Sequence, residues 1–141
     1  MEYRKFASKY LVRLDIGEDI VEAVKDLAKK EGIRLGSVTG IGAVNKATIG
    51  LYEVSKQEYI STELSGDMEI VSLGGNISEM NGEVYVHLHI ALGTSDSNVK
   101  AGHLNSAIIS GTGELIIDEI EGRVDRTKDD ISGLNIFKFN N

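Results

Sequence analysis

The chain has three histidines, and their spacing is its clearest sign of chemistry. His87 and His89 stand two residues apart in the apolar run VHLHI, and His103 follows after a predicted chain reversal. Successive side chains of an extended strand point to opposite faces, so His87 and His89 share one face and their apolar neighbours share the other. Two imidazoles on one strand face form a two-donor platform for a metal ion.

The place of His103 depends on the register of the returning strand. If the reversal in TSDSNVK is centred near Ser97, Ala91 lies opposite His103, which puts His103 diagonal to His89 on the same face. A slip of one residue would turn His103 to the other face. In the first register, three neutral imidazoles with one or two water positions describe a catalytic-type zinc site, and nickel, iron or manganese could use the same donors.

The same residues have a purely structural interpretation. Two partly buried histidines can hydrogen-bond their neighbours while the third lies in a loop, and H-x-H in a strand is a moderately specific pattern. Two carboxylates are candidates for proton transfer, because Glu69 in GDMEIVSL and Glu114 in GTGELII stand inside apolar strand runs. Either could act as a base or hydrogen-bond a ligating imidazole, although each also fits the solvent face of a strand.

Glycines mark several places where the backbone has a special task. GIGAVN contains G-x-G but lacks the third glycine of a dinucleotide fingerprint and precedes a strand-like segment, so it predicts a tight turn. Gly74, Gly75 and Gly102 predict positions where the chain bends or another group approaches closely.

One amphipathic helix is expected within GEDIVEAVKDLAKKEGI, residues 17–33, with acidic residues at its start, lysines at its end and Gly32 as its stop. Its apolar face would consist of Ile20, Val21, Val24, Leu27 and Ala28. About eight strands are expected from the β-forming segments YLVRL, RLGSV, ATIGLYEV, YISTEL, MEIVSLGGNI, EVYVHLHIAL, AIISG, ELIIDEIEGRV and LNIFKF. Asn81-Gly82 predicts a hairpin that pairs MEIVSLGGNI with EVYVHLHIAL. These elements predict an α+β fold with a mostly antiparallel sheet.

Composition limits the class of protein. A chain of 141 residues predicts one domain over residues 1–141. No segment is apolar enough to span a membrane or to act as a signal peptide, so a cytoplasmic location is expected. Without cysteine, a metal must be held by nitrogen or oxygen donors. The net charge of −7 disfavours direct DNA binding, and the basic groups, including RVDRTK near the C-terminus, are expected on the solvated surface.

The ordered segments together resemble a prokaryotic PPC ("plants and prokaryotes conserved") domain. The similarity is carried by YLVRLDIGEDIVEAVKDLAKKEGI, SVTGIGAVNKATIGLY, MEIVSLGGNIS, VHLHIALG, AGHL and RTKDDISGL. The resemblance implies an α+β fold built on an antiparallel sheet and a homotrimer. It also implies a fold similar to that of acetolactate decarboxylase and of a human ester hydrolase, which hold zinc through H-x-H and a later histidine. Carried onto this chain, that ligand set falls on His87, His89 and His103.

Different functions remain open at this point. A divalent metal, with zinc as the leading candidate, would let the protein act on or sense a small oxygen-rich molecule. The resemblance also implies a DNA-binding or transcription-associated role, because plant relatives join this domain to AT-hook segments. This chain lacks the RGRP core of an AT-hook, as it has no proline. A non-enzymatic trimeric interaction module is the third possibility, so the sequence leaves open whether the protein is an enzyme.

Overall fold

The predicted helix is present in the computed structural model, which describes residues 1–139, as α1 (Ile20–Glu31). The Asp19 side chain caps its start by accepting hydrogen bonds from the backbone N–H groups of Val21 and Glu22, at 2.8 and 3.0 Å. Gly32 ends it in the left-handed conformation, with φ at 72°. Of the predicted apolar face, Ile20, Val24, Leu27 and Ala28 are buried and Val21 is half-buried.

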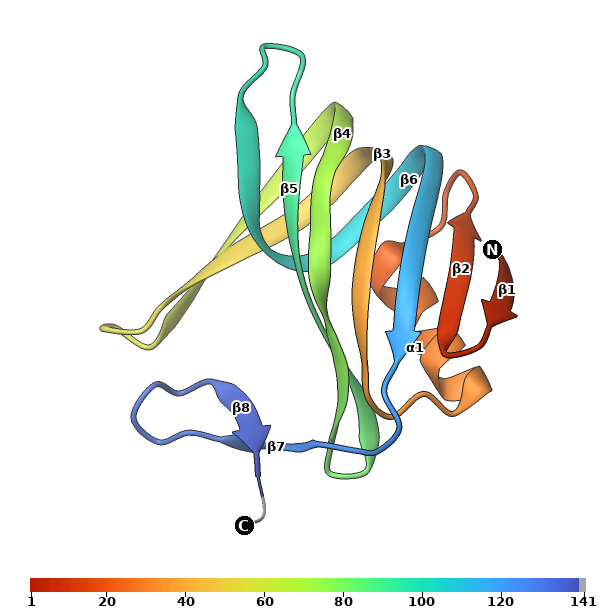
Figure 1. The fold of residues 1–141 in the computed structure, drawn as a ribbon. Coiled ribbons are helices and arrows are strands. Elements are labelled where there is room, and N and C mark those ends of the chain that lie inside the picture. Colours follow the sequence, from red (N-terminus) through yellow and green to blue (C-terminus); the bar gives the residue numbers. More distant parts are fainter. Residues whose placement is uncertain (140–141) are drawn as a thin grey trace.

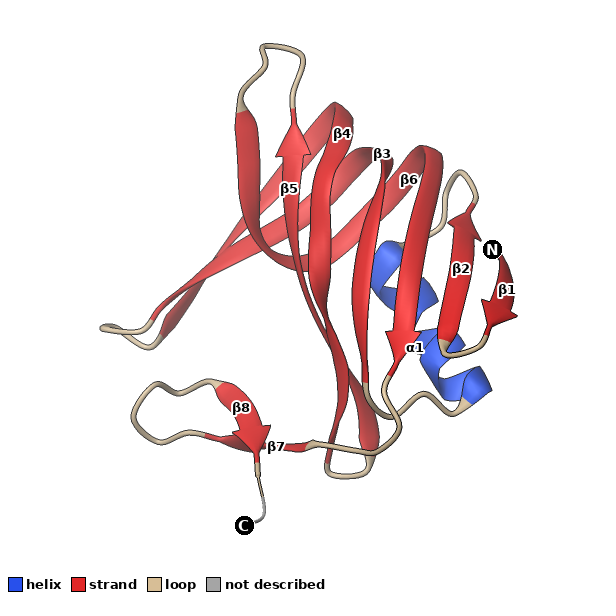
Figure 2. Ribbon diagram, in the orientation of Figure 1, coloured by secondary structure: helices blue, strands red, loops and turns tan. Residues whose placement is uncertain are grey.

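Strands make up most of the molecule, as Figures 1 and 2 show. Their bounds are β1 (Glu2–Phe6), β2 (Lys9–Leu14), β3 (Gly36–Glu53), β4 (Glu58–Met80), β5 (Glu83–Gly93), β6 (Val99–Glu119), β7 (Asp125–Lys128) and β8 (Asn135–Lys138). Six of them form one antiparallel sheet in the order β1-β2-β6-β3-β4-β5, and β5 also pairs with β6. Strands β6, β3, β4 and β5 therefore form a closed ring in which each strand pairs with two others of the four. Strands β7 and β8 form a separate hairpin. The α+β class with a mostly antiparallel sheet is confirmed.

The predicted hairpin at Asn81-Gly82 is also present. Met80 of β4 pairs with Glu83 of β5, and the two turn residues have φ values of 55° and 82°. Positive φ at both central residues is typical of a type I′ turn, whose twist matches that of the strands it joins. This turn fixes the register of β5 against β4.

Three strands are much longer than the segments that predicted them. β3, β4 and β6 each join two segments expected as separate strands, because bulges bend these strands without ending them. The tight turn expected at GIGAVN is therefore wrong: this segment continues β3 through a bulge between Gly40 and Gly42. At Gly42 φ is 150°, and a Cβ would lie 2.2 Å from the Thr112 carbonyl oxygen. β1 and β7 were not predicted, because EYRKF and DRTK lack an alternating apolar pattern.

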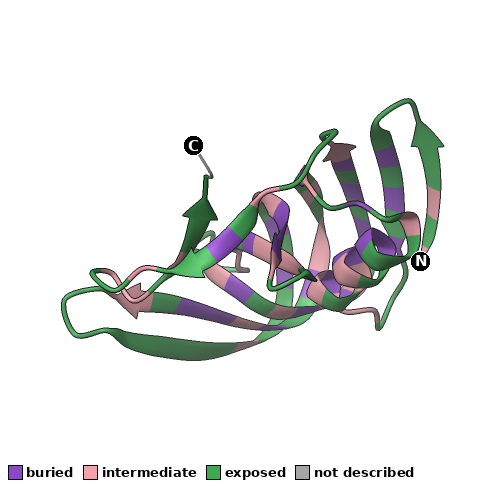
Figure 3. Cartoon of the chain, turned by 90° about the horizontal axis from the view of Figure 1, so that it is seen from below, coloured by how far each residue is buried: buried purple, intermediate pink, exposed green. Residues whose placement is uncertain are grey.

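The hydrophobic core lies between α1 and one face of the sheet. On β5, Leu88, Ile90 and Leu92 are buried in the same cluster as the apolar face of α1. The alternate residues of β5, which include His87 and His89, are less buried and point to the other face. Figure 3 shows this alternation of buried and exposed positions along the strands. Among the described residues, no helix is long and apolar enough to cross a membrane.

Candidate metal site

The loop between β5 and β6 sets the position of His103. The Asp96 carboxylate accepts hydrogen bonds from the Thr94 hydroxyl and from the Asn98 backbone N–H group. The Thr94 N–H group donates to the Asn98 carbonyl oxygen at 2.9 Å. These bonds close the loop between Thr94 and Asn98, so the reversal is centred on Asp96, one residue before Ser97.

This loop shifts the pairing of β6 by two residues from the expected register. His103 lies directly opposite His89, and Ala91 pairs with Ala101. The diagonal arrangement predicted from the sequence is therefore wrong. A shift of two residues preserves the face of every side chain, so His103 points to the predicted face.

The three imidazoles converge on one point. Their ring centroids are 5.2 Å apart for His87 and His89, 5.1 Å for His87 and His103, and 5.5 Å for His89 and His103. One nitrogen from each ring lies within 4.8 Å of the other two. Three imidazoles in this arrangement offer a nitrogen-only ligand set that leaves room for a further ligand.

The surroundings of His87 and His103 favour the neutral form of these two side chains. Burial is the main reason that the pKa of His87 falls to about 4, and the positive charges of His103, Arg126 and His89 lower it further. Burial, followed by the charge of His89, also lowers the pKa of His103. A lowered pKa leaves the imidazole unprotonated near neutral pH, and the unprotonated nitrogen is the form that binds a metal.

Glycines lie opposite two of the histidines. Gly74 of β4 pairs with His89, and Gly50 of β3 pairs with His103. A Cβ on Gly74 would meet no atom within 4 Å, whereas the Tyr59 side chain takes the space over Gly50. The histidines form part of the floor of a cavity of about 830 Å³. The rest of its lining includes Tyr59, Tyr85, Asn76 and, from the C-terminal segment, Arg126 and Phe137.

The β7–β8 hairpin closes one side of this cavity. It contacts the end of the long β3–β4 hairpin, where the Gln57 side-chain amide donates to the Ile131 carbonyl oxygen at 3.3 Å. Figure 1 shows these two hairpins next to each other. Arg126 of β7 is only 6% exposed, so the surface position expected for the RVDRTK segment is wrong at this residue. Its partners belong to β4 and to β8, which no local pattern in DRTK indicates.

A tyrosine of the cavity lining stands beside His103. The rings of Tyr59 and His103 meet edge to face, with centroids 6.1 Å apart. The Tyr59 hydroxyl donates a hydrogen bond to Asn105, and burial raises the pKa of the Tyr59 hydroxyl. Tyr59 therefore presents a protonated hydroxyl near the histidines. Sequence reasoning missed it, because a tyrosine in YISTEL is an ordinary strand residue.

The two carboxylates expected near the histidines lie elsewhere. Glu69 is opposite Gly93, four residues beyond His89 along β5, a separation of ~13 Å at the usual rise of a strand. It lines a different hollow together with Ser110. Glu114 pairs with Arg13 and Ile41, and neither carboxylate lines the histidine cavity. A proton-transfer role for Glu69 or Glu114 stays a prediction that these positions do not favour.

Comparison with known proteins relates this fold to a described family. A family model described as the Plants and Prokaryotes Conserved (PCC) domain matches residues 1–121. The match includes α1 and the six-stranded sheet with all three histidines, and it ends before the β7–β8 hairpin. The chain has no significant match among curated proteins.

Solved structures give a closer comparison. A candidate DNA-binding protein from Bacteroides thetaiotaomicron is 40% identical, with a TM-score of 0.95 over 98% of this chain and 96% of that one. A metal-containing protein from Archaeoglobus fulgidus is 34% identical, with a TM-score of 0.88 over the same shares of the two chains. A plant- and prokaryote-conserved protein from Pyrococcus horikoshii is 30% identical, with a TM-score of 0.86 over 99% and 95%.

Proposed function

This chain belongs to the Plants and Prokaryotes Conserved (PCC) domain family, and we propose that it holds a divalent metal ion, zinc before others, and binds a small oxygen-rich molecule beside that ion. The observation that carries the proposal is the convergence of His87, His89 and His103, with one nitrogen from each ring within 4.8 Å of the others. The cavity above these nitrogens gives a small molecule access to the open side of the ion.

The donor set fits zinc. Three neutral imidazoles with an open position are a ligand set of catalytic zinc sites, whereas calcium and magnesium prefer oxygen ligands. The A. fulgidus relative, which is 34% identical, is a metal-containing protein. That likeness supports a metal ion in this chain. The choice of zinc rests on the chemistry of the three nitrogen donors.

The site has the parts to act on a ligand or to sense it. A metal on three imidazoles polarises a carbonyl group or lowers the pKa of bound water towards ~7. The chain itself supplies the Tyr59 hydroxyl near His103; its O–H group is donated to Asn105, and its oxygen can accept a hydrogen bond from a hydroxyl group of the bound molecule. Phe137 and the aromatic ring of Tyr85 supply apolar lining that excludes water from one side of the cavity.

We extend the proposal to assembly as a homotrimer. Leu11, Ile41 and Ile116 line one shallow hollow on the outside of the sheet, where they are 47%, 59% and 46% exposed. Leu11 and Ile116 are directly opposite each other on β2 and β6. Contiguous exposed apolar side chains of this kind are typical of contacts between protein chains.

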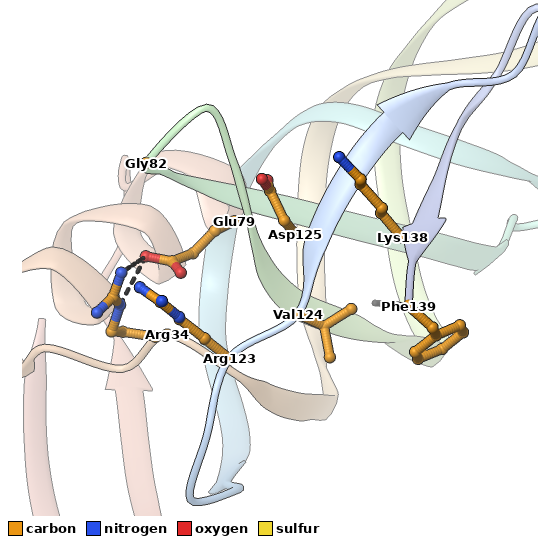
Figure 4. Close-up of a pocket in the computed structure, with 8 residues that line it drawn as sticks. All are labelled: Arg34, Glu79, Gly82, Arg123, Val124, Asp125, Lys138 and Phe139. Carbon is orange, nitrogen blue, oxygen red and sulfur yellow. Dashed lines mark hydrogen bonds and ion pairs between the residues drawn. The ribbon is translucent and has the colours of Figure 1, made fainter. Parts of the chain in front are cut away.

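DNA binding is the second candidate, because the relative from B. thetaiotaomicron is a candidate DNA-binding protein. Basic side chains do gather in one hollow, where Arg34, Arg123 and Lys138 lie with Glu79 and Asp125 (Figure 4). However, Arg34 is paired with Glu79 at 2.6 Å, and the chain as a whole carries a charge of −7. Three basic against two acidic side chains leave the hollow with one net positive charge, which is less than binding to a phosphate backbone requires.

A pair of measurements on the purified chain separates the two functions. Elemental analysis of protein grown with zinc is expected to give about one zinc per chain, because one triad per chain provides the ligands. In the same preparation, an electrophoretic shift assay with duplex DNA is expected to show no retention, even at low salt. Metal-free protein that retains DNA increasingly as salt is lowered would contradict the proposal and favour the DNA-binding function.

A further inference from the structure

Arg126 carries a buried guanidinium that pairs with no acidic side chain of residues 1–139; the Asp125 carboxylate accepts from the Arg126 backbone N–H group instead, at 2.9 Å. Arg126 is the only buried basic residue among residues 1–139, and no carboxylate of that range lies within ion-pair distance of it. Its guanidinium donates hydrogen bonds to neutral acceptors only: Ser78 Oγ at 2.8 Å, the Asn135 carbonyl oxygen at 2.6 Å and Asn76 Oδ1 at 2.8 Å. A buried charge is costly unless it is paired, so this cation has a strong preference for an anion beside it.

The guanidinium is held close to the histidines. Asn76, which accepts from Nη2, is the cross-strand partner of His87, and Ser78, which accepts from Nε, is the partner of Tyr85. Directly paired residues of neighbouring strands share a face and lie side by side. Arg126 therefore lies over two successive residue pairs of β4 and β5, Asn76–His87 and Ser78–Tyr85, on the face of the sheet that carries the histidines.

Two aromatic rings fix the guanidinium in place. Its central carbon lies 4.7 Å from the centroid of the Tyr85 ring and 4.4 Å from that of Phe137. The three hydrogen bonds leave one N–H group on Nη1 and one on Nη2 without a partner among the described residues. A planar group held in this way is suited to an oxyanion, which accepts two N–H bonds from one arginine.

Among residues 1–139, no acidic side chain lines the cavity to neutralise the charge of Arg126. The chain has 22 acidic and 15 basic residues, yet the charged residue in the described lining is Arg126. The histidines are neutral ligands, so a divalent ion would keep its full charge there. The site is thus an electropositive cavity in an acidic protein, which selects for anions and against cations.

The lining also suits an anion that has an organic part. Leu51, Leu134 and Ile136 line the cavity together with aromatic side chains, and its volume of about 830 Å³ is far larger than an inorganic ion. We propose that the molecule bound beside the metal is a small organic acid whose carboxylate or phosphate group is recognised by Arg126. The proposal rests on the metal site proposed above, and it assigns a role to the hairpin beyond residue 121.

The first test compares acid and amide in the unaltered protein. The probes are 3-phenyllactate, its primary amide and phenyl phosphate, titrated calorimetrically into the zinc-loaded chain. We expect at least one of the two acids to bind at least ~10-fold more tightly than the amide, because the amide cannot accept two charge-assisted bonds from the guanidinium. Equal affinity for acids and amide, or no binding of either acid at millimolar concentration, would overturn the proposal.

The second test removes the charge. Arg126→Gln is expected to weaken binding of the preferred acid at least ~10-fold while zinc stays near one per chain. Arg126→Lys keeps the charge without the planar fork and should bind the acid with intermediate affinity. Arg123→Gln, which removes a charge from the neighbouring hollow, is the matched control and should leave the affinity unchanged. Unchanged binding in Arg126→Gln would contradict the proposal.

The metal and the anion are tested separately. If the chain contains no zinc, the proposed metal site fails, and the same titrations on metal-free protein still show whether Arg126 selects the acid. If zinc is present but acid and amide bind alike, the metal site stands and the anion proposal fails.

Discussion

Replacing His87 by alanine is expected to abolish stoichiometric metal binding. Two imidazoles would remain, and loss of a direct ligand should weaken affinity by more than the ~10–100-fold that loss of an outer partner costs. His89→Ala and His103→Ala should have the same effect, because each ring contributes one of the three converging nitrogens. Competition with a chromophoric chelator measures the affinity, and elemental analysis measures the stoichiometry.

Glu69→Gln and Glu114→Gln are matched controls for these variants. Both remove an ionisable side chain from a strand outside the histidine cavity, so metal content should stay at the level of the unaltered chain. If His103→Ala kept its metal while Glu69→Gln lost it, the ligand set would have to be reassigned.

Gly75→Ala is expected to destabilise the fold by about 2–3 kcal/mol, at the upper end of the usual effect of overpacking. A Cβ on Gly75 would lie 1.9 Å from the carbonyl oxygen of His87, which is backbone and cannot rotate away. Relief would require β5 to move away from β4 where it carries the first histidine. Urea denaturation monitored by circular dichroism measures the change in the free energy of unfolding.

Gly74→Ala, one residue earlier in β4, is the control for Gly75→Ala. A Cβ there would meet no atom within 4 Å, and Gly74 has no positive φ. Gly74→Ala should therefore change the free energy of unfolding by less than ~0.5 kcal/mol. Equal destabilisation by the two substitutions would mean that the spacing between β4 and β5 differs from that in the structure.

Patterns in the sequence correctly predicted the elements that depend on residues close together in the chain. α1 follows from apolar residues at helical spacing, from the Asp19 cap and from Gly32. The hairpin between β4 and β5 follows from Asn81-Gly82. The long strands were divided too often, because a glycine in a bulge has the same local sequence as a glycine in a turn.

The histidine site was predictable as a set of residues but not as a complete cavity. The period of two along a strand fixes the face of His87 and His89, whereas the partner of His103 depends on the side chain of Asp96. Arg126 was missed because its bonds reach Ser78 and Asn76, 48 and 50 residues earlier in the chain. A contact of that kind follows from tertiary packing and leaves no periodic trace in the sequence. The relation to acetolactate decarboxylase stays a prediction.

The most direct test of the metal site is anomalous X-ray diffraction from crystals of the zinc-loaded chain, measured on both sides of the zinc absorption edge. We expect one strong anomalous peak per chain, ~2.1 Å from one nitrogen of each of His87, His89 and His103, with the remaining coordination position of the ion facing the cavity. Zinc-replete crystals without a peak at the three imidazoles, or with a peak that excludes His103, would contradict this expectation.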